Sequence, residues 1–220
     1  MSPILFFSIF TILCFLIVGV AIRFFPKDAT FTIAIGAVIG ANIYTSLAYP
    51  ISIGGITFGI DSIVYTLFLF CLLLMHESFG KKNMRVVLYT ALFSIFFTAF
   101  LFFMGNLSQG GYSNALMMNF LSYLFSIIAT FCAAWVMIWL YDKFKLAGLN
   151  IYLNFLIVIL LASLVNTMIY FGLSFLLTSL VVENFLLVLV GSYIGKFVAS
   201  MCCLGVFALH RHWCKSKEDV

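Results

Sequence analysis

The sequence predicts an all-α integral membrane protein with about seven transmembrane helices. Hydrophobic residues make up 65% of the 220 residues and charged residues only 8%, whereas an ordinary soluble domain is roughly half apolar and a quarter charged. The apolar residues form continuous runs of roughly 20 residues, the length that a helix needs to cross a bilayer. This composition excludes a soluble enzyme, a disordered protein and a fibrous repeat. We therefore expect the lipid bilayer to be the surroundings with which the chain interacts.

Seven apolar segments are each long enough to cross roughly 30 Å of hydrocarbon at about 1.5 Å per residue. Pro26 ends the first segment and Pro50 ends the second, because proline cannot continue a helix. The first segment lacks the basic start and the small-residue cleavage site of a signal peptide, so we expect it to be retained. The expected helices cover residues 4–25, 31–49, 56–75, 86–104, 115–141, 151–178 and 182–210.

Lysine and arginine concentrate in every second connection between these helices. The connections after the second and fourth helices contain neither residue type, and the connection after the sixth contains only Glu183 as a charged residue. Because basic connections remain in the cytoplasm, the pattern predicts an outer N-terminus and a cytoplasmic C-terminus. We divide the chain into a transmembrane bundle over residues 1–210 and a cytoplasmic basic tail over residues 211–220. The basic residues in the alternating connections are Arg23, Lys27, Lys81, Lys82, Arg85, Lys143, Lys145, Arg211, Lys215 and Lys217.

Lys196 is the remaining basic residue, and it lies about midway along the seventh segment. At that depth its side chain cannot easily reach either membrane surface. A charged side chain inside a bilayer is costly and therefore marks a functional site by default. Either a bound solute or a polar group on another helix could be the partner that the buried ammonium group needs. We favour the solute-binding site over the structural link.

Several neutral polar residues lie at a depth similar to that of Lys196. Asn166 has Ser163 three residues before it and Tyr170 four residues after it, so one helical face carries all three. Asn42 falls near mid-membrane on the second segment. These residues could line a polar pocket for a flat, hydrogen-bonding solute. Polar residues also hold membrane helices together without any ligand, and the sequence leaves the two interpretations nearly even.

Two acidic residues lie near the ends of the third segment. Asp61, near the outer end, is expected to face headgroup water or to cap the helix, and it would reach Lys196 only if the helices are tilted. Glu77, at the inner end, precedes Lys81 by four residues. That spacing favours a local ion pair over a role in gating.

The sequence contains no pattern typical of catalysis, of a cofactor or of nucleic-acid binding. It has no nucleophile–base pair, no HExxH or CxxC spacing, and no long basic run, so we expect no enzyme activity. The H-R-H-W-C run over residues 210–214 could hold a metal, but a basic tail at the membrane edge is the preferred interpretation. The glycine-rich connection over residues 105–114 is expected to be a flexible connector rather than an outer lid.

An ordered set of short motifs resembles a known transporter family. G-A-N-I at 40–43, T-F-G at 57–59 and H-E-S-F-G-K-K-N-M-R at 76–85 are similar to the VUT family, the vitamin-uptake transporters that include bacterial queuosine-precursor transporters. The last motif resembles the E-x-Y-G-K-K-x-x-[KR] of that family. Further along, L-V-N-T-M-I-Y-F at 164–171 and Y-I-G-K at 193–196 resemble its L-I-D-[ST]-L-I-F and Y-x-x-K segments.

The resemblance implies an importer of the bacterial inner membrane that moves 7-deazaguanine bases without an ATPase. It also implies a fold similar to the substrate-binding subunits of energy-coupling-factor transporters, with one additional N-terminal helix. Formation of a homo-oligomer stays open. The site residues carried over from the family are Asn42, Glu77, Asn166 and Lys196, and the face of Asn166 adds Ser163 and Tyr170.

Several polar side chains of the family pattern are replaced in this chain, and the acidic partners expected for Lys196 are missing. The loss keeps a second hypothesis open, in which a divergent member senses a ligand or docks a partner in the membrane. The replaced positions are Leu73 and Asn166 for aspartates, Ser163 for a glutamine, Asn154 for an arginine, and Ala134 and Met137 for a glutamine and an aspartate.

Overall fold

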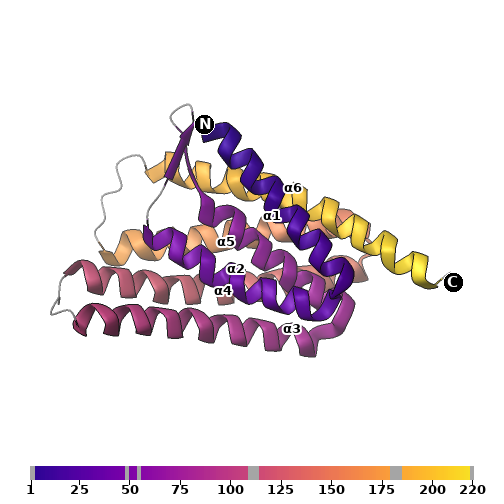
Figure 1. The fold of residues 1–220 in the computed structure, drawn as a ribbon, viewed down its shortest axis with the longest axis horizontal. Coiled ribbons are helices and arrows are strands. Elements are labelled where there is room, and N and C mark those ends of the chain that lie inside the picture. Colours follow the sequence, from indigo (N-terminus) through magenta and orange to yellow (C-terminus); the bar gives the residue numbers. More distant parts are fainter. Residues whose placement is uncertain (1–2, 48–49, 54–55, 109–113, 179–184, 219–220) are drawn as a thin grey trace.

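The protein is a bundle of six helices with one short hairpin, within the residues that the computed structural model describes (3–47, 50–53, 56–108, 114–178 and 185–218). The helices lie side by side along the long axis of the molecule, and the two chain termini lie at opposite ends (Figure 1). The elements in chain order are α1 (Pro3–Phe24), α2 (Pro26–Leu47), β1 (Pro50–Ile53), β2 (Ile56–Gly59), α3 (Ile60–Ser108), α4 (Asn114–Leu146), α5 (Ile151–Thr178) and α6 (Phe185–Glu218).

Helix α3 is bent back on itself, as Figure 1 shows. A straight helix of its 49 residues would be about 73 Å long, more than twice the thickness of a hydrocarbon core. Gly80 interrupts it with φ 83° and ψ 166°, a conformation that side chains with a Cβ rarely adopt. The two arms, 60–79 and 81–108, occupy the place of the predicted helices 56–75 and 86–104. The third and fourth predicted helices thus correspond to the two arms of one bent element, α3, and the number of membrane crossings stays a prediction.

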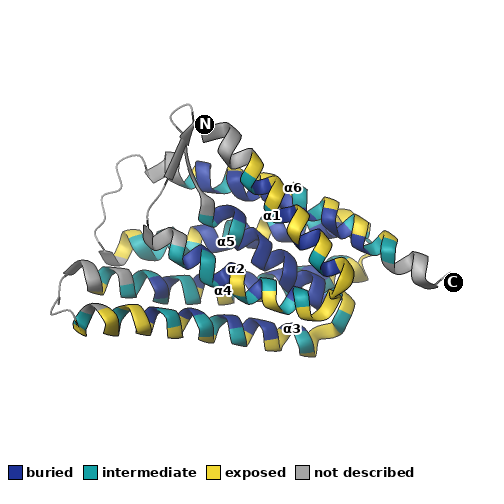
Figure 2. Ribbon diagram, in the orientation of Figure 1, coloured by how far each residue is buried: buried dark blue, intermediate teal, exposed yellow. Residues whose placement is uncertain are grey.

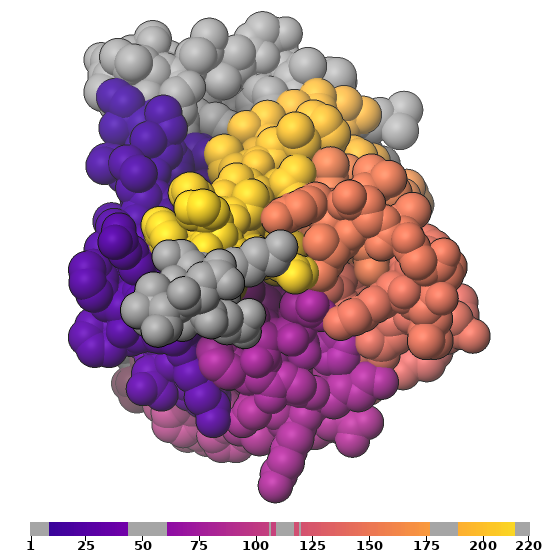
Figure 3. All heavy atoms as spheres, turned by 90° about the vertical axis from the view of Figure 1, so that its right-hand side faces the viewer, coloured from indigo at the N-terminus to yellow at the C-terminus, as the bar shows by residue number. Residues whose placement is uncertain are grey.

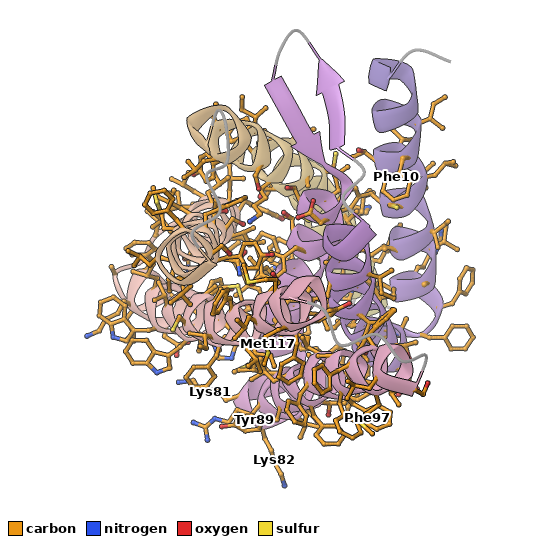
Figure 4. All side chains as sticks on the ribbon, turned by 90° about the vertical axis from the view of Figure 1, so that its left-hand side faces the viewer. Phe10, Lys81, Lys82, Tyr89, Phe97 and Met117 are labelled. Carbon is orange, nitrogen blue, oxygen red and sulfur yellow. The ribbon has the colours of Figure 1, made fainter. Side chains whose placement is uncertain are left out.

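A short antiparallel hairpin precedes α3, and its second strand occupies residues for which the sequence had predicted helix. The strands pair from Pro50 opposite Gly59 to Ile53 opposite Ile56, so the predicted start of the third helix at residue 56 is wrong. Two β-branched runs on either side of Gly-Gly are typical of a hairpin, and this signal was missed. β2 packs against α6 and β1 against α1, and Figure 4 shows the hairpin between those helices.

The other helices agree with the prediction more closely. α5 spans Ile151–Thr178, as predicted. α2 begins at Pro26 rather than at residue 31, because proline is well tolerated in the first helical turn. α6 continues to Glu218, so residues 211–218 of the predicted tail extend the last helix. Residues 109–113 of the glycine-rich connection, Glu183 and the side chain of Cys214 lie outside the described residues.

The first arm of α3 forms the centre of the bundle. Residues 67–75 are buried on every side of the helix, which is typical of a helix enclosed by others. Helices α2, α4, α5 and α6 all contact α3. This central position makes the first arm the element against which the polar residues of the other helices are placed.

Figure 2 shows exposed residues along the outside of the helices, and many of these residues are large and hydrophobic. Soluble proteins rarely expose large contiguous apolar patches, whereas lipid covers them in a membrane. Among the described residues, four helical spans are long and apolar enough to cross a membrane, namely 61–105, 120–146, 151–176 and 189–213. The protein is therefore a multi-pass membrane protein. Exposed apolar side chains include Leu13, Leu16, Ile17 and Val20 on α1 and Phe93, Phe96, Phe97 and Phe100 on the second arm of α3.

Basic residues from four separate segments gather at one end of the bundle, which we call the basic end and which faces the viewer in Figure 3. The contacts join the end of α1, the bend of α3 and the ends of α4 and α6. The alternation of basic connections along the sequence predicts this gathering, and the side of the membrane on which it lies stays a prediction. The contacts are Arg23 with the Trp213 ring (5.0 Å to its centroid), Lys81 with Asp142 (2.7 Å), Lys145 with Glu77 (2.7 Å) and Arg211 with Glu77 (3.8 Å).

Candidate functional site

Lys196 is buried inside the bundle, with only 4% of its surface exposed. Its Nζ donates hydrogen bonds to Asn166 Oδ1 at 3.1 Å and to Thr167 Oγ1 at 2.6 Å. The same atom lies 5.2 Å from the centroid of the Tyr65 ring, within the range of a cation–π contact. The lysine of α6 is thus connected to α5 and to the first arm of α3, and both of its hydrogen-bond acceptors are neutral.

Three buried hydroxyl groups lie around these contacts. Ser163 Oγ has no hydrogen-bond partner within the described part of the chain, and it shares the α5 face of the two lysine acceptors. The hydroxyls of Tyr65 and Thr130 lie close enough to pair with each other across α3 and α4. A buried polar group without a partner costs about 1–3 kcal/mol, so hydrogen-bonding capacity is left unused here. We call Tyr65, Thr130, Ser163, Asn166, Thr167 and Lys196 the Lys196 cluster.

The backbone of α5 sets the direction of the hydrogen bonds in the cluster. Thr167 Oγ1 donates to Ser163 O at 2.8 Å, so its oxygen remains to accept from the lysine. An ammonium group has three donors, and two of them go to Asn166 and Thr167. With the remaining donor of Lys196, the amide of Asn166 and the unpaired hydroxyl of Ser163, the cluster contains several groups that can donate hydrogen bonds.

Asp61 lies on the side of the cluster that faces away from the basic end. It is in the first turn of α3, and its charge interacts with Lys196 and with Tyr170. The structure therefore supports the alternative in which helix tilt brings Asp61 toward the lysine. At the same level, Ser62 Oγ and Ser192 Oγ lie 3.1 Å apart. This contact fixes α6 against α3 one helical turn before Lys196.

Asn42 reaches the level of the cluster from a different helix. It lies on α2, which packs chiefly on α3, and its Nδ2 donates to Val38 O at 2.8 Å. A Cβ placed on Gly40, two residues earlier, would lie 3.6 Å from Val64 Cγ1, and Val64 is the neighbour of Tyr65. Asn42 is buried, with 6% of its surface exposed.

Tyr170 and Glu77 lie at different distances from the cluster. Tyr170 is half-buried one turn beyond Asn166 and interacts with Ser122 of α4. Glu77 follows Tyr65 by 12 residues on the same arm, which corresponds to about 18 Å along the helix axis. Glu77 is therefore at the basic end, and the structure does not bring it to Lys196.

The predicted ion pair between Glu77 and Lys81 is wrong. The non-helical backbone of Gly80 ends the first arm between the two residues, so they do not have the i,i+4 geometry of a continuous helix. Lys81 Nζ instead lies 2.7 Å from Asp142 Oδ2, whose other oxygen lies 2.8 Å from His76 Nε2. The carboxylates of Glu77 and Asp142 thus connect three helices at the basic end.

Sequence reasoning missed half of the Lys196 cluster. Thr167 is four residues after Ser163, and this spacing could have placed it on the predicted polar face. Tyr65 and Thr130 lie on two other helices, and no spacing along the chain relates them to Lys196. The pairing of Asp142 with His76 and Lys81 was also missed, because each belongs to a segment treated as a separate connection or helix end.

A buried polar cluster lies inside a bundle whose surface faces lipid, and buried charges in membrane helices are candidates for a functional site. The chain belongs to the family described as "putative vitamin uptake transporter", whose model matches residues 60–210. The matched region contains the whole Lys196 cluster and both carboxylates of the basic end. No curated protein and no solved structure matches the chain, so the expected similarity to energy-coupling-factor subunits stays a prediction.

Positions that differ from the family pattern are part of the core. Leu73, Ala134 and Met137 are each 0% exposed, so apolar side chains fill places where the resemblance implies charged or amide groups. Asn154 is also buried, and its Nδ2 donates to Tyr141 O at 3.1 Å. The described interior therefore holds fewer charges than the family pattern predicts.

Proposed function

We propose that the protein imports a small planar solute across the bacterial inner membrane and that the Lys196 cluster binds this solute. The observation that carries the proposal is a buried ammonium group whose two hydrogen-bond acceptors, on Asn166 and Thr167, are neutral. A buried charge requires compensation by an opposite charge or by several dipoles. The charge of Asp61 supplies part of this compensation, and a solute with carbonyl or anionic acceptor atoms would add to it. Membership of a vitamin-uptake family supports a small molecule as the transported species.

The chemistry of the cluster favours a flat solute with both donor and acceptor atoms, and we propose a 7-deazaguanine base. The ring of Tyr65 offers a face for stacking. The amide of Asn166 and the unpaired hydroxyl of Ser163 can each donate and accept, as the edge of such a base requires. Lys196 would donate to its carbonyl oxygen, and Tyr170 and Asn42 would border the site from two sides.

We propose that the solute enters from the end that carries the β1–β2 hairpin and leaves at the basic end. The distribution of basic residues supports a cytoplasmic basic end, with the N-terminus outside and the C-terminus inside. Lys196 connects α3, α5 and α6, so a rocking movement of these helices would open the site to alternate sides. Glu77 would act at the inner opening rather than in contact with the bound solute.

Uptake of a labelled 7-deazaguanine base by bacteria that lack their own transporter tests the proposal. Cells that express the wild-type protein should accumulate the label, and cells that express Lys196→Ala or Asn166→Leu should not. The exposed Lys27 provides the control, since Lys27→Gln should retain uptake. Membrane abundance of each variant is measured by immunoblot. Wild-type uptake by both site variants at equal abundance would refute the proposed site.

A ligand-sensing or partner-docking role is the second candidate. The apolar residues at Leu73, Ala134 and Met137 favour it, because they remove groups of the family pattern that an ion-coupled importer could use. Binding of the base to the purified protein, measured by thermal shift, combined with no accumulation in cells would favour this role. Accumulation of the base would exclude a purely sensory role.

A further inference from the structure

The lipid-facing surface near the basic end carries two parallel stripes of aromatic and basic side chains. On the second arm of α3, Arg85 and Tyr89 are four residues apart and Lys82 precedes Arg85 by three, so one face presents all of them. On α4, Trp135, Trp139 and Lys143 follow each other at intervals of four. We call these six residues the α3–α4 basic face; all are exposed, with exposed fractions of 59% for Tyr89, 62% for Trp135 and 51% for Trp139.

The two stripes lie on neighbouring helices. The ion pair between Lys81 and Asp142, at 2.7 Å, joins the start of the second arm to the end of α4. Lys82 follows Lys81, and Lys143 follows Asp142. Both stripes therefore have a cation at the basic end and aromatic rings farther from that end along the outside of the bundle. Figure 4 shows Lys81, Lys82 and Tyr89 along one outer edge of the bundle.

The cations of this face have no acidic partner among the residues that the structure describes. Within the described residues, Lys82, Arg85 and Lys143 form no ion pair. The two nearby carboxylates, Glu77 and Asp142, are already paired with other basic groups. Three exposed positive charges therefore point outward at the boundary between the apolar surface and water.

We propose that the α3–α4 basic face binds an anionic glycerophospholipid. The phosphate would be held by Lys82, Arg85 and Lys143, since guanidinium and ammonium groups form strong charge-assisted hydrogen bonds with phosphate oxygens. The acyl chains would lie along the rings of Trp135 and Trp139, because aromatic side chains prefer the interfacial depth of a bilayer. The face has cations at the basic end and aromatic rings next to them. This combination fits a lipid better than a soluble anion, because a soluble anion has no acyl chain that would contact the rings. The proposal does not depend on the transported solute.

Titration of the purified protein in a neutral detergent with phosphatidylglycerol, and separately with phosphatidylcholine, tests this site. We expect phosphatidylglycerol alone to raise the unfolding temperature. The triple variant Lys82→Gln/Arg85→Gln/Lys143→Gln should bind it about 100-fold more weakly, because each interfacial cation contributes about fivefold. The matched control Lys27→Gln, which removes an exposed cation outside this face, should bind as tightly as the wild type.

Fluorescence gives an independent measure of the contact with acyl chains. In a Trp213→Phe background, brominated phosphatidylglycerol should quench Trp135 and Trp139 at lower lipid concentration than brominated phosphatidylcholine. Equal quenching by both lipids, full phosphatidylglycerol binding by the triple variant, or an equal thermal shift with inorganic phosphate would each overturn the proposal. A loss of binding in Lys27→Gln as large as that in the triple variant would also overturn it, since net charge alone would then decide.

Discussion

The substitution Lys196→Met removes the buried charge of the Lys196 cluster and keeps a flexible side chain of similar reach. In the wild type, Lys196 Nζ donates hydrogen bonds of 3.1 and 2.6 Å to Asn166 and Thr167, and each is worth about 1.5–3 kcal/mol when the donor is charged. The contact with the Tyr65 ring adds about 0.5–2 kcal/mol. Burial of the ammonium group opposes these gains by several kcal/mol.

The favourable and unfavourable contributions of Lys196 are of similar size, so we expect Lys196→Met to change the free energy of unfolding by less than about 2 kcal/mol. Asn166→Leu has a different effect, because the charge stays buried and loses one acceptor. We expect a destabilisation of about 1.5–3 kcal/mol from that loss. If Lys196 serves binding rather than folding, Asn166→Leu should be less stable than Lys196→Met.

Thermal unfolding of both purified variants in the same detergent measures this order, and solute binding is measured on the same samples. Lys196→Met should lose solute binding while it remains folded at the wild-type temperature within a few degrees. If Lys196→Met is instead clearly less stable than Asn166→Leu and still binds the solute, the lysine is a structural link between helices. Lys196 would then not be part of a solute-binding site.

Three further substitutions test other parts of the structure. Ser163→Ala removes a buried hydroxyl without a partner, so the unfolding temperature without solute should be unchanged or higher, while affinity for the solute falls. A large loss of stability would contradict the unpaired state of this hydroxyl. Gly80→Ala forces a Cβ into a backbone with φ +83° and should destabilise the protein by about 1–2 kcal/mol, whereas Gly105→Ala, which meets open space, should be neutral in the same thermal assay. Asp142→Asn weakens the contacts to Lys81 and to its histidine neighbour and should lower stability more than Lys81→Gln, whose side chain is 58% exposed and whose surface ion pair is worth about 0–1 kcal/mol. Equal effects of these two variants would show that the histidine contact adds nothing.

Much of the architecture follows from local properties of the chain. The apolar length of each segment predicted the helices, and α5 has the predicted limits, Ile151–Thr178. The alternation of basic connections predicted that they would meet at one end, where Lys145 and Arg211 now contact Glu77. The depth of Lys196 and Asn166 predicted that they lie at one level, and they are hydrogen-bonded. Their role in solute binding stays a prediction.

The partners of each polar residue were decided by the tertiary structure. Glu77 pairs across helices instead of with Lys81, because the backbone of Gly80 rotates the two arms of α3 relative to each other. Tyr65 and Thr130 meet near Lys196 because α3 and α4 pack with those faces inward. Hydropathy and helical spacing are local properties, so they can be determined from the sequence. The rotation and tilt of whole helices depend on how all their side chains pack together, and only the folded bundle sets them.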